Sequence, residues 1–172
     1  DPDMQVRCRS MSYLPACRVP EDSLRIRPAL ADPEEDVRRA AALALGVYRD
    51  RGACELLAER LRTDESVVVR AMAATALALI GDRRAVPSLE AALGVETDGW
   101  VRVELVAALY RLGQRGRWKE LLAFLREPGP LEPVMALSAI GLVLRPPQRR
   151  SAEAAIKALA EDESVWSAVR EY

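Results

Sequence analysis

The sequence predicts an all-α protein that folds as an α-solenoid, a superhelix of about five stacked helix–turn–helix repeats followed by a partial repeat at the C-terminal end. Three observations predict this: a dipeptide that recurs at nearly constant spacing, an apolar helical stripe after each copy, and a turn signal after each stripe. The composition agrees, because 50% of the 172 residues are hydrophobic, 30% are charged and only 9 are glycine. One helical hairpin cannot bury its own apolar face, so such hairpins stack and share a continuous core.

The dipeptide Val-Arg marks the start of the first helix in each unit. Copies follow one another at nearly equal intervals, at Val6-Arg7, Val37-Arg38, Val69-Arg70 and Val101-Arg102. An acidic residue lies five positions before each valine, at Asp1, Asp32, Asp64 and Glu96. After the valine, apolar residues recur at the spacing of one helix face. In the third unit these positions are Val69, Ala73, Ala76, Leu77 and Ile80.

A turn signal ends each first helix, and a second amphipathic helix follows. The turns are Arg49-Asp50-Arg51-Gly52, Gly81-Asp82-Arg83-Arg84 and Gly113-Gln114-Arg115-Gly116. Glycine favours a left-handed helix end, and Asp50 or Asp82 can cap the next segment. The second helices carry leucine pairs that recur with the same period, namely Leu57/Leu61, Leu89/Leu93 and Leu121/Leu125, and Ile26 and Leu30 take these places in the first unit. We expect repeats at 1–31, 32–63, 64–95, 96–128 and 129–161, with a partial cap at 162–172.

The repeated residues resemble the HEAT repeat family, of the short bacterial kind found in scaffold proteins and in phycobilin lyases. The pattern in the third unit is Asp64–Val69-Arg70–Ala73–Ala76-Leu77–Asp82–Ala85–Leu89–Leu93. The resemblance implies that the repeated arginines and the turn aspartates join neighbouring units in a hydrogen-bonded ladder. Its expected members are Arg38, Asp50, Arg70, Asp82 and Arg102. We therefore expect these arginines to stabilise the fold rather than to bind a partner.

The resemblance also implies that the second helices line the concave surface of the solenoid and contact a partner protein there. Their positions outside the core vary between units while the core positions repeat. The expected partner-binding residues are Glu55, Glu59, Arg62, Glu90, Trp118, Lys119, Leu122 and Arg126. Trp118 is the expected anchor, because tryptophan is enriched at interface hot spots, with packing between units as the alternative role.

Composition argues against an enzyme. The chain has no histidine, so serine or cysteine nucleophiles paired with histidine are excluded, and no catalytic residue, metal ligand set or cofactor is predicted. The cysteines Cys8, Cys17 and Cys54 form no metal-binding or disulfide pattern, which favours a reducing, cytoplasmic location. No apolar run approaches the roughly 18 residues needed to cross a membrane.

The charge balance argues against nucleic acid as the partner, because 25 Lys and Arg residues are matched by 26 Asp and Glu residues. The turns nevertheless carry a second set of arginines that could meet phosphates, including Arg49, Arg51, Arg83, Arg84, Arg115 and Arg117. The preferred function is a non-catalytic protein-interaction scaffold or adaptor. Two alternatives stay open: a DNA-binding solenoid similar to DNA glycosylases, and a subunit similar to a bilin lyase.

Overall fold

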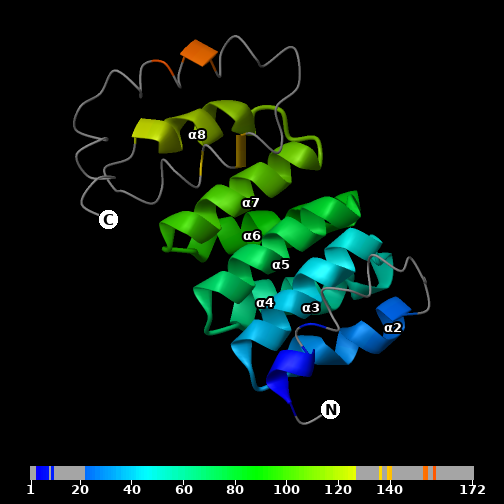
Figure 1. Ribbon diagram of the computed structural model, residues 1–172. Coiled ribbons are helices and arrows are strands. Elements are labelled where there is room, and N and C mark those ends of the chain that lie inside the picture. Colours follow the sequence, from blue (N-terminus) through cyan, green and yellow to red (C-terminus); the bar gives the residue numbers. More distant parts are fainter. Residues whose placement is uncertain are drawn as a thin grey trace, which may run out of the picture.

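A computed structural model of the chain describes residues 3–7, 9, 22–126, 136, 139, 140, 153, 154 and 157. In these residues the elements are helices that stack one after another along the chain (Figure 1). The longer helices are α3 (Glu35–Tyr48), α4 (Cys54–Thr63), α5 (Val67–Ile80), α6 (Val86–Val95), α7 (Gly99–Arg111) and α8 (Arg117–Ala123). The shorter elements are α2 (Asp22–Ile26) and the 3-10 segments η1 (Arg27–Ala31), η2 (Arg51–Ala53), η3 (Arg83–Ala85) and η4 (Phe124–Arg126). The predicted all-α solenoid is confirmed.

The helices form two rows. The first helices of three consecutive units, α3, α5 and α7, pack on one another, and each is followed by a second helix, α4, α6 or α8. The spans expected for the second, third and fourth repeats each contain one such pair. The expected repeat 129–161, apart from 136, 139, 140, 153, 154 and 157, and the expected cap 162–172 lie outside the described residues.

Local capping explains where the first helices begin and end. The Ser66 hydroxyl accepts a hydrogen bond from the Val69 backbone N–H and so caps the start of α5. Gly81 ends α5 in the left-handed conformation, with φ of 77°. Arg49 ends α3 in the same conformation, with φ of 55°, which is uncommon for a residue that has a Cβ atom.

The turn aspartates cap the 3-10 segments that open the second helices. Asp50 accepts from the backbone N–H of Gly52, and Asp82 accepts from that of Arg84, each at 3.0 Å. The expected capping role of the two residues is therefore confirmed. The same kind of capped 3-10 segment connects the first helix to the second in both units.

The core is a continuous seam between the two rows. Six leucines with no exposed surface come from both helices of three successive units: Leu45, Leu57, Leu77, Leu89, Leu109 and Leu121. Burying one such side chain contributes about 1.5–3 kcal/mol to folding. The stripe and the leucine pairs that define the repeat in the sequence are therefore the residues that hold the units together.

The second helix of the first unit differs from those of the later units. Ile26 and Leu30 are both buried, as their places in the repeat require. However, α2 ends at Ile26 and the chain continues as a 3-10 segment with Pro28 near its start. Proline has no backbone N–H to continue the α-helical pattern, which explains the break.

Candidate functional site: a groove on the second-helix face

A ladder of arginines ties each unit to the next. Arg38 donates from Nε to Asp64 Oδ2 at 2.9 Å and from Nη1 to the carbonyl oxygens of Asp32 and Pro33. It thereby fixes the loop at the start of its own unit and the acid that opens the following unit. The same arrangement links three successive pairs: Arg7–Asp32, Arg38–Asp64 and Arg70–Glu96.

The expected pairing of these arginines with the turn aspartates was wrong. Asp50 binds Arg27, with Nη2 to Oδ1 at 2.6 Å, and Asp82 binds Arg84 of its own turn. Arg102 donates to carbonyl oxygens only, among the described residues. The acids that lie five positions before each valine recur with the same period as the arginines, and this was the sequence signal for the true partners.

The ion pairs at the turns lower the pKa of both turn aspartates. Hydrogen bonds from the Arg27 guanidinium lower the pKa of Asp50, and burial opposes this shift. Hydrogen bonds from the Arg84 side chain and backbone lower the pKa of Asp82 to about 2. Both carboxylates are therefore charged and already engaged at neutral pH.

The first-helix row is closely packed. A Cβ atom at Gly46 of α3 would lie 2.8 Å from the Ala76 Cα atom of α5, so the two helices touch through their backbones. No residue of α5 or α7 is exposed, including those that point away from the core. α5 and α7 therefore offer little surface of their own, whereas α3 exposes Leu43 and Val47.

The second-helix row is more open. Half or more of the residues of α4 and α6 are exposed, and a groove separates the two helices. The second helices, where the sequence placed the expected contacts, therefore expose more of their residues than the first helices do. That these helices form the concave side of the stack stays a prediction.

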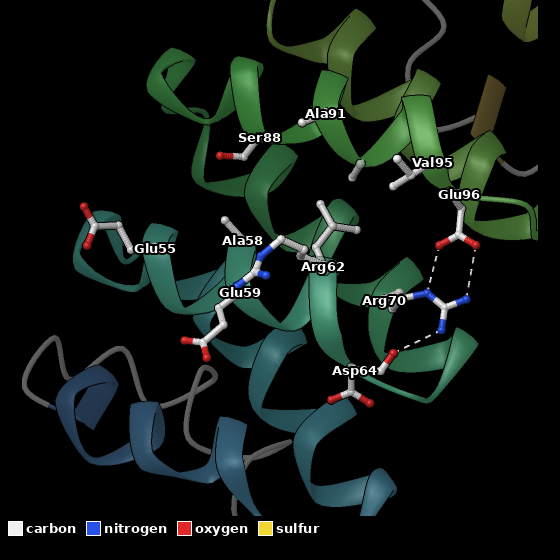
Figure 2. A pocket seen from close by; sticks show the side chains of 12 residues that line it. Glu55, Ala58, Glu59, Arg62, Asp64, Arg70, Ser88, Ala91, Val95 and Glu96 are labelled. Atoms are coloured by element: carbon white, nitrogen blue, oxygen red, sulfur yellow. Dashed lines mark hydrogen bonds and ion pairs between the residues drawn. The ribbon is translucent and has the colours of Figure 1, made fainter.

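The groove between α4 and α6 has a volume of about 750 Å³. Figure 2 shows Glu55 of α4 near one end and the ion pair between Arg70 and Glu96 near the other. Val95 of α6 lines the groove with 78% of its surface exposed, more than any other large apolar residue in the described part of the chain. The remaining α4 and α6 residues that line it are Ala58, Glu59, Leu61, Arg62, Ser88, Ala91 and Ala92.

Small side chains create this groove. Ala58, Ser88 and Ala91 stand where larger residues would fill the space between the helices. Between α6 and α8, polar contacts occupy the corresponding place, because Glu90 accepts from Gln114 Nε2 at 2.5 Å. The repeat is therefore regular in its core and irregular on the face of the second helices.

The structure brings together three of the residues expected to bind a partner, since Glu55, Glu59 and Arg62 all line the groove. Glu90 instead binds Gln114, and Lys119 is exposed on α8. The side chain of Arg126 lies outside the described residues.

Trp118 is half-buried, with its ring centroid 5.6 Å from that of Tyr110, and it packs against the core together with Leu122. The contact with Tyr110 lies within one unit, between α7 and α8. Sequence reasoning missed Val95, whose only signal is that an apolar residue stands where the preceding unit has Thr63.

A second hollow of about 480 Å³ lies where the groove reaches the turns. Its lining includes Arg51, Cys54 and Arg84, and it shares Glu55 and Ser88 with the groove. Burial raises the pKa of the Cys54 thiol, so this cysteine is mostly protonated at neutral pH and weakly nucleophilic.

Within the described ranges, no group of acidic or sulfur ligands could hold a metal ion. The helices in that part of the chain are also too short or too polar to cross a membrane.

These features define an α-helical repeat protein with an exposed groove. The HEAT repeats family matches residues 23–110, which is just over half of the chain. The chain therefore belongs to the HEAT repeat family, whose repeats generally mediate protein–protein interactions. A comparison with curated protein sequences finds no match.

Proposed function

We propose that the chain is a non-catalytic interaction module that holds a segment of a partner protein in the groove between α4 and α6. The observation that carries this proposal is the combination of exposed apolar surface and exposed carboxylates in one groove, of which Glu59 also pairs with Arg60 at 3.4 Å. Val95 and Ala91 are exposed on one wall, and Glu55 and Glu59 are exposed on the other. Glu55 forms no ion pair with any described residue.

The groove suits recognition because it is formed before the partner arrives. Its walls are two helices held by the buried leucine seam, so binding orders little backbone of this chain. Burial of Val95 and the neighbouring alanines provides affinity, and the carboxylates select basic side chains on the partner. Lys119, on the adjoining α8 of the same row, adds a further contact for a longer segment.

Selection from a displayed library of random peptides against the intact chain tests the proposal. Ala91→Trp places an indole in the groove, and Leu43→Trp on α3 is the matched control on the other row. We expect the selected peptides to be enriched in apolar and basic residues, and to bind Ala91→Trp at least about tenfold more weakly than the parent chain. Leu43→Trp is expected to bind them normally.

Two results would contradict the groove as the binding site. One is equal peptide binding by the parent chain and by Ala91→Trp, with both proteins folded by circular dichroism. The other is loss of binding in Leu43→Trp alone, which would transfer the site to the first-helix row. Glu55→Gln with Glu59→Gln then separates the charge contribution, because both side chains keep their size.

A further inference from the structure

The turns within the hairpins form one edge of the solenoid, here named the turn edge and made of residues 49–53, 81–85 and 113–117. Arginines occupy equivalent positions in the three turns, at Arg51, Arg83 and Arg115, each one repeat after the last. Arg49 and Arg84 flank them. All five are exposed, so the edge presents a row of guanidinium groups with the period of the repeat.

Among the five arginines of this row, the acids on the turn edge pair only with Arg84. Asp50 is engaged by Arg27, and Asp82 is engaged by Arg84. Within the described part of the chain, Arg49, Arg51, Arg83 and Arg115 form no ion pair at all. The other carboxylates near this edge are Glu55 at the start of α4, and Glu90 and Glu120, which both contact Arg117.

Contacts inside the protein hold two of the four arginines in place. Arg83 donates from Nε to the Leu112 carbonyl oxygen at 3.1 Å and packs over Gly113 of the next turn. The Arg115 guanidinium lies 4.9 Å from the centre of the Tyr110 ring. Neither contact neutralises the charge, so these side chains are positioned in advance without losing their ability to bind an anion.

The opposite edge has the reverse charge. It consists of the loops between units, 32–34, 64–66 and 96–98, and the helix starts that follow them. Three ladder arginines there, Arg7, Arg38 and Arg70, are matched by acids, while Arg102 forms no ion pair with a described residue. Further exposed acids lie beside them, of which Asp36 pairs with Arg39: Glu34, Glu35, Asp36 and Glu65. The near-zero net charge of the chain therefore conceals a separation of charge between its two edges.

We propose that the turn edge docks an acidic segment of a partner protein in an extended conformation. Successive units of a helical stack repeat at about 8–10 Å. A polyproline-II segment has about three residues per turn and rises about 3.1 Å per residue, so every third side chain lies on one side, about 9 Å from the next. An acidic residue at every third position therefore matches the arginine row, one carboxylate to each turn. None of the turn arginines lines the α4–α6 groove proposed above, although Arg51 and Arg84 line the hollow that adjoins it.

Fluorescence anisotropy with a labelled peptide of about four Glu-Pro-Pro repeats tests the proposal at low ionic strength. The comparison peptide has the same composition with its glutamates contiguous. We expect the regular peptide to bind more tightly, and its affinity to fall as salt is added. Replacing Arg51, Arg83 and Arg115 with serine is expected to weaken its binding by about tenfold, since three exposed charge pairs are lost.

Matched variants show whether the peptide binds the arginines of the turn edge or responds only to the net charge of the chain. Arg9→Ser, Arg25→Ser and Arg39→Ser together change the net charge by the same amount at positions outside the turns, and this control is expected to bind like the parent chain. Because Arg83 also bonds the Leu112 carbonyl, Arg51→Ser with Arg115→Ser provides a second test variant that keeps that contact. This double variant is expected to bind the regular peptide more weakly than the parent chain does, but by a smaller factor than the triple turn variant.

Three outcomes would overturn the proposal. If the control variant binds the regular peptide as weakly as the triple turn variant does, the effect depends on net charge and not on the turn edge. Tighter binding of single-stranded DNA than of the regular peptide, lost in the turn variants, would assign the arginines to phosphates. Salt-sensitive self-association of the chain, lost in the same variants, would assign the edge to the acidic edge of a second copy. The groove is tested with a different set of peptides, so the two proposals fail independently.

Discussion

The two helix rows arise from the same repeat but behave in opposite ways. In the row of α3, α5 and α7, small residues recur at one depth, and Ala44, Ala76 and Ala108 are all buried. In the row of α4, α6 and α8, about half of the positions face solvent, and their identities change from unit to unit. The difference indicates that the first row provides cohesion between units and that the second row is free to vary. Substitutions in the two rows test this difference, because those in the first row should affect stability more than those in the second.

The largest effect is expected where the ladder joins one unit to the next. Arg38→Ala removes an ion pair whose side chains are 9% and 1% exposed, and the buried Asp64 carboxylate then keeps only the more distant Arg60, at 3.9 Å, as a cationic partner. We expect a loss of about 3 kcal/mol in the free energy of unfolding, at the lower end of the range for breaking a buried pair because Arg60 and the Ser66 backbone N–H still contact Asp64.

The neighbouring residue provides the control for Arg38. Arg39 pairs with Asp36 one helical turn away, and both side chains are exposed, at 40% and 58%. Arg39→Ala is expected to change the unfolding free energy by less than about 0.5 kcal/mol. Urea unfolding monitored by circular dichroism measures both, and similar losses in the two variants would contradict the role given to the ladder.

A glycine-to-alanine substitution is expected to destabilise the protein in the first-helix row and to stabilise it in the second-helix row. Gly46→Ala puts a methyl group 2.8 Å from the Ala76 backbone, and we expect it to destabilise the protein by about 1–3 kcal/mol because neither helix can move away. Gly94→Ala in α6 meets nothing within 4 Å and is expected to stabilise the protein by about 0.4–1 kcal/mol through lower backbone entropy in the unfolded state. Thermal unfolding of the two variants measures both effects. A higher melting temperature for Gly46→Ala would show that α3 and α5 can move apart to accommodate the methyl group.

The smallest effect concerns pH. Glu104 of α7 accepts a hydrogen bond from the Thr75 hydroxyl of α5 at 2.8 Å, and burial raises the pKa of its carboxyl. The pKa of this carboxyl is higher in the folded state than in the unfolded state. At low pH the carboxyl is protonated in both states, so its burial does not destabilise the folded protein there. Its destabilising effect grows as pH rises from the unfolded pKa through the folded one, and it is complete above both.

Replacing the Glu104 carboxyl with a neutral amide removes that effect. We expect Glu104→Gln to melt at a higher temperature than the parent chain at neutral pH, with the difference shrinking as the solution is acidified. Melting temperatures recorded across a pH series provide the measurement. A constant difference at every pH would mean that the amide acts through packing and not through charge.

The core and the unit architecture could be predicted from the sequence because they depend on periodicity. The positions that recur in successive units, such as Leu57 and Leu89, are fully buried. The ladder was predicted only in part. Arg38 and Arg70 were recognised as ladder residues, but they bind Asp64 and Glu96 instead of the expected turn aspartates Asp50 and Asp82. Spacing along the chain indicates which residues repeat, but it does not indicate which two repeated residues meet between units.

The groove and the unequal packing of the two rows are the features that the tertiary structure decided. Glu55, Glu59 and Arg62 were expected to contact a partner, but the groove that joins them to Val95 depends on the distance between α4 and α6. In the other row, α3 and α5 approach closely at Gly46 and Ala76, a contact between residues of different units. The sequence by itself therefore determined the repeat, its helices and its buried seam, since these follow from local periodicity and apolar burial. Only the tertiary structure decided which row is open, because that depends on how backbones from different units pack.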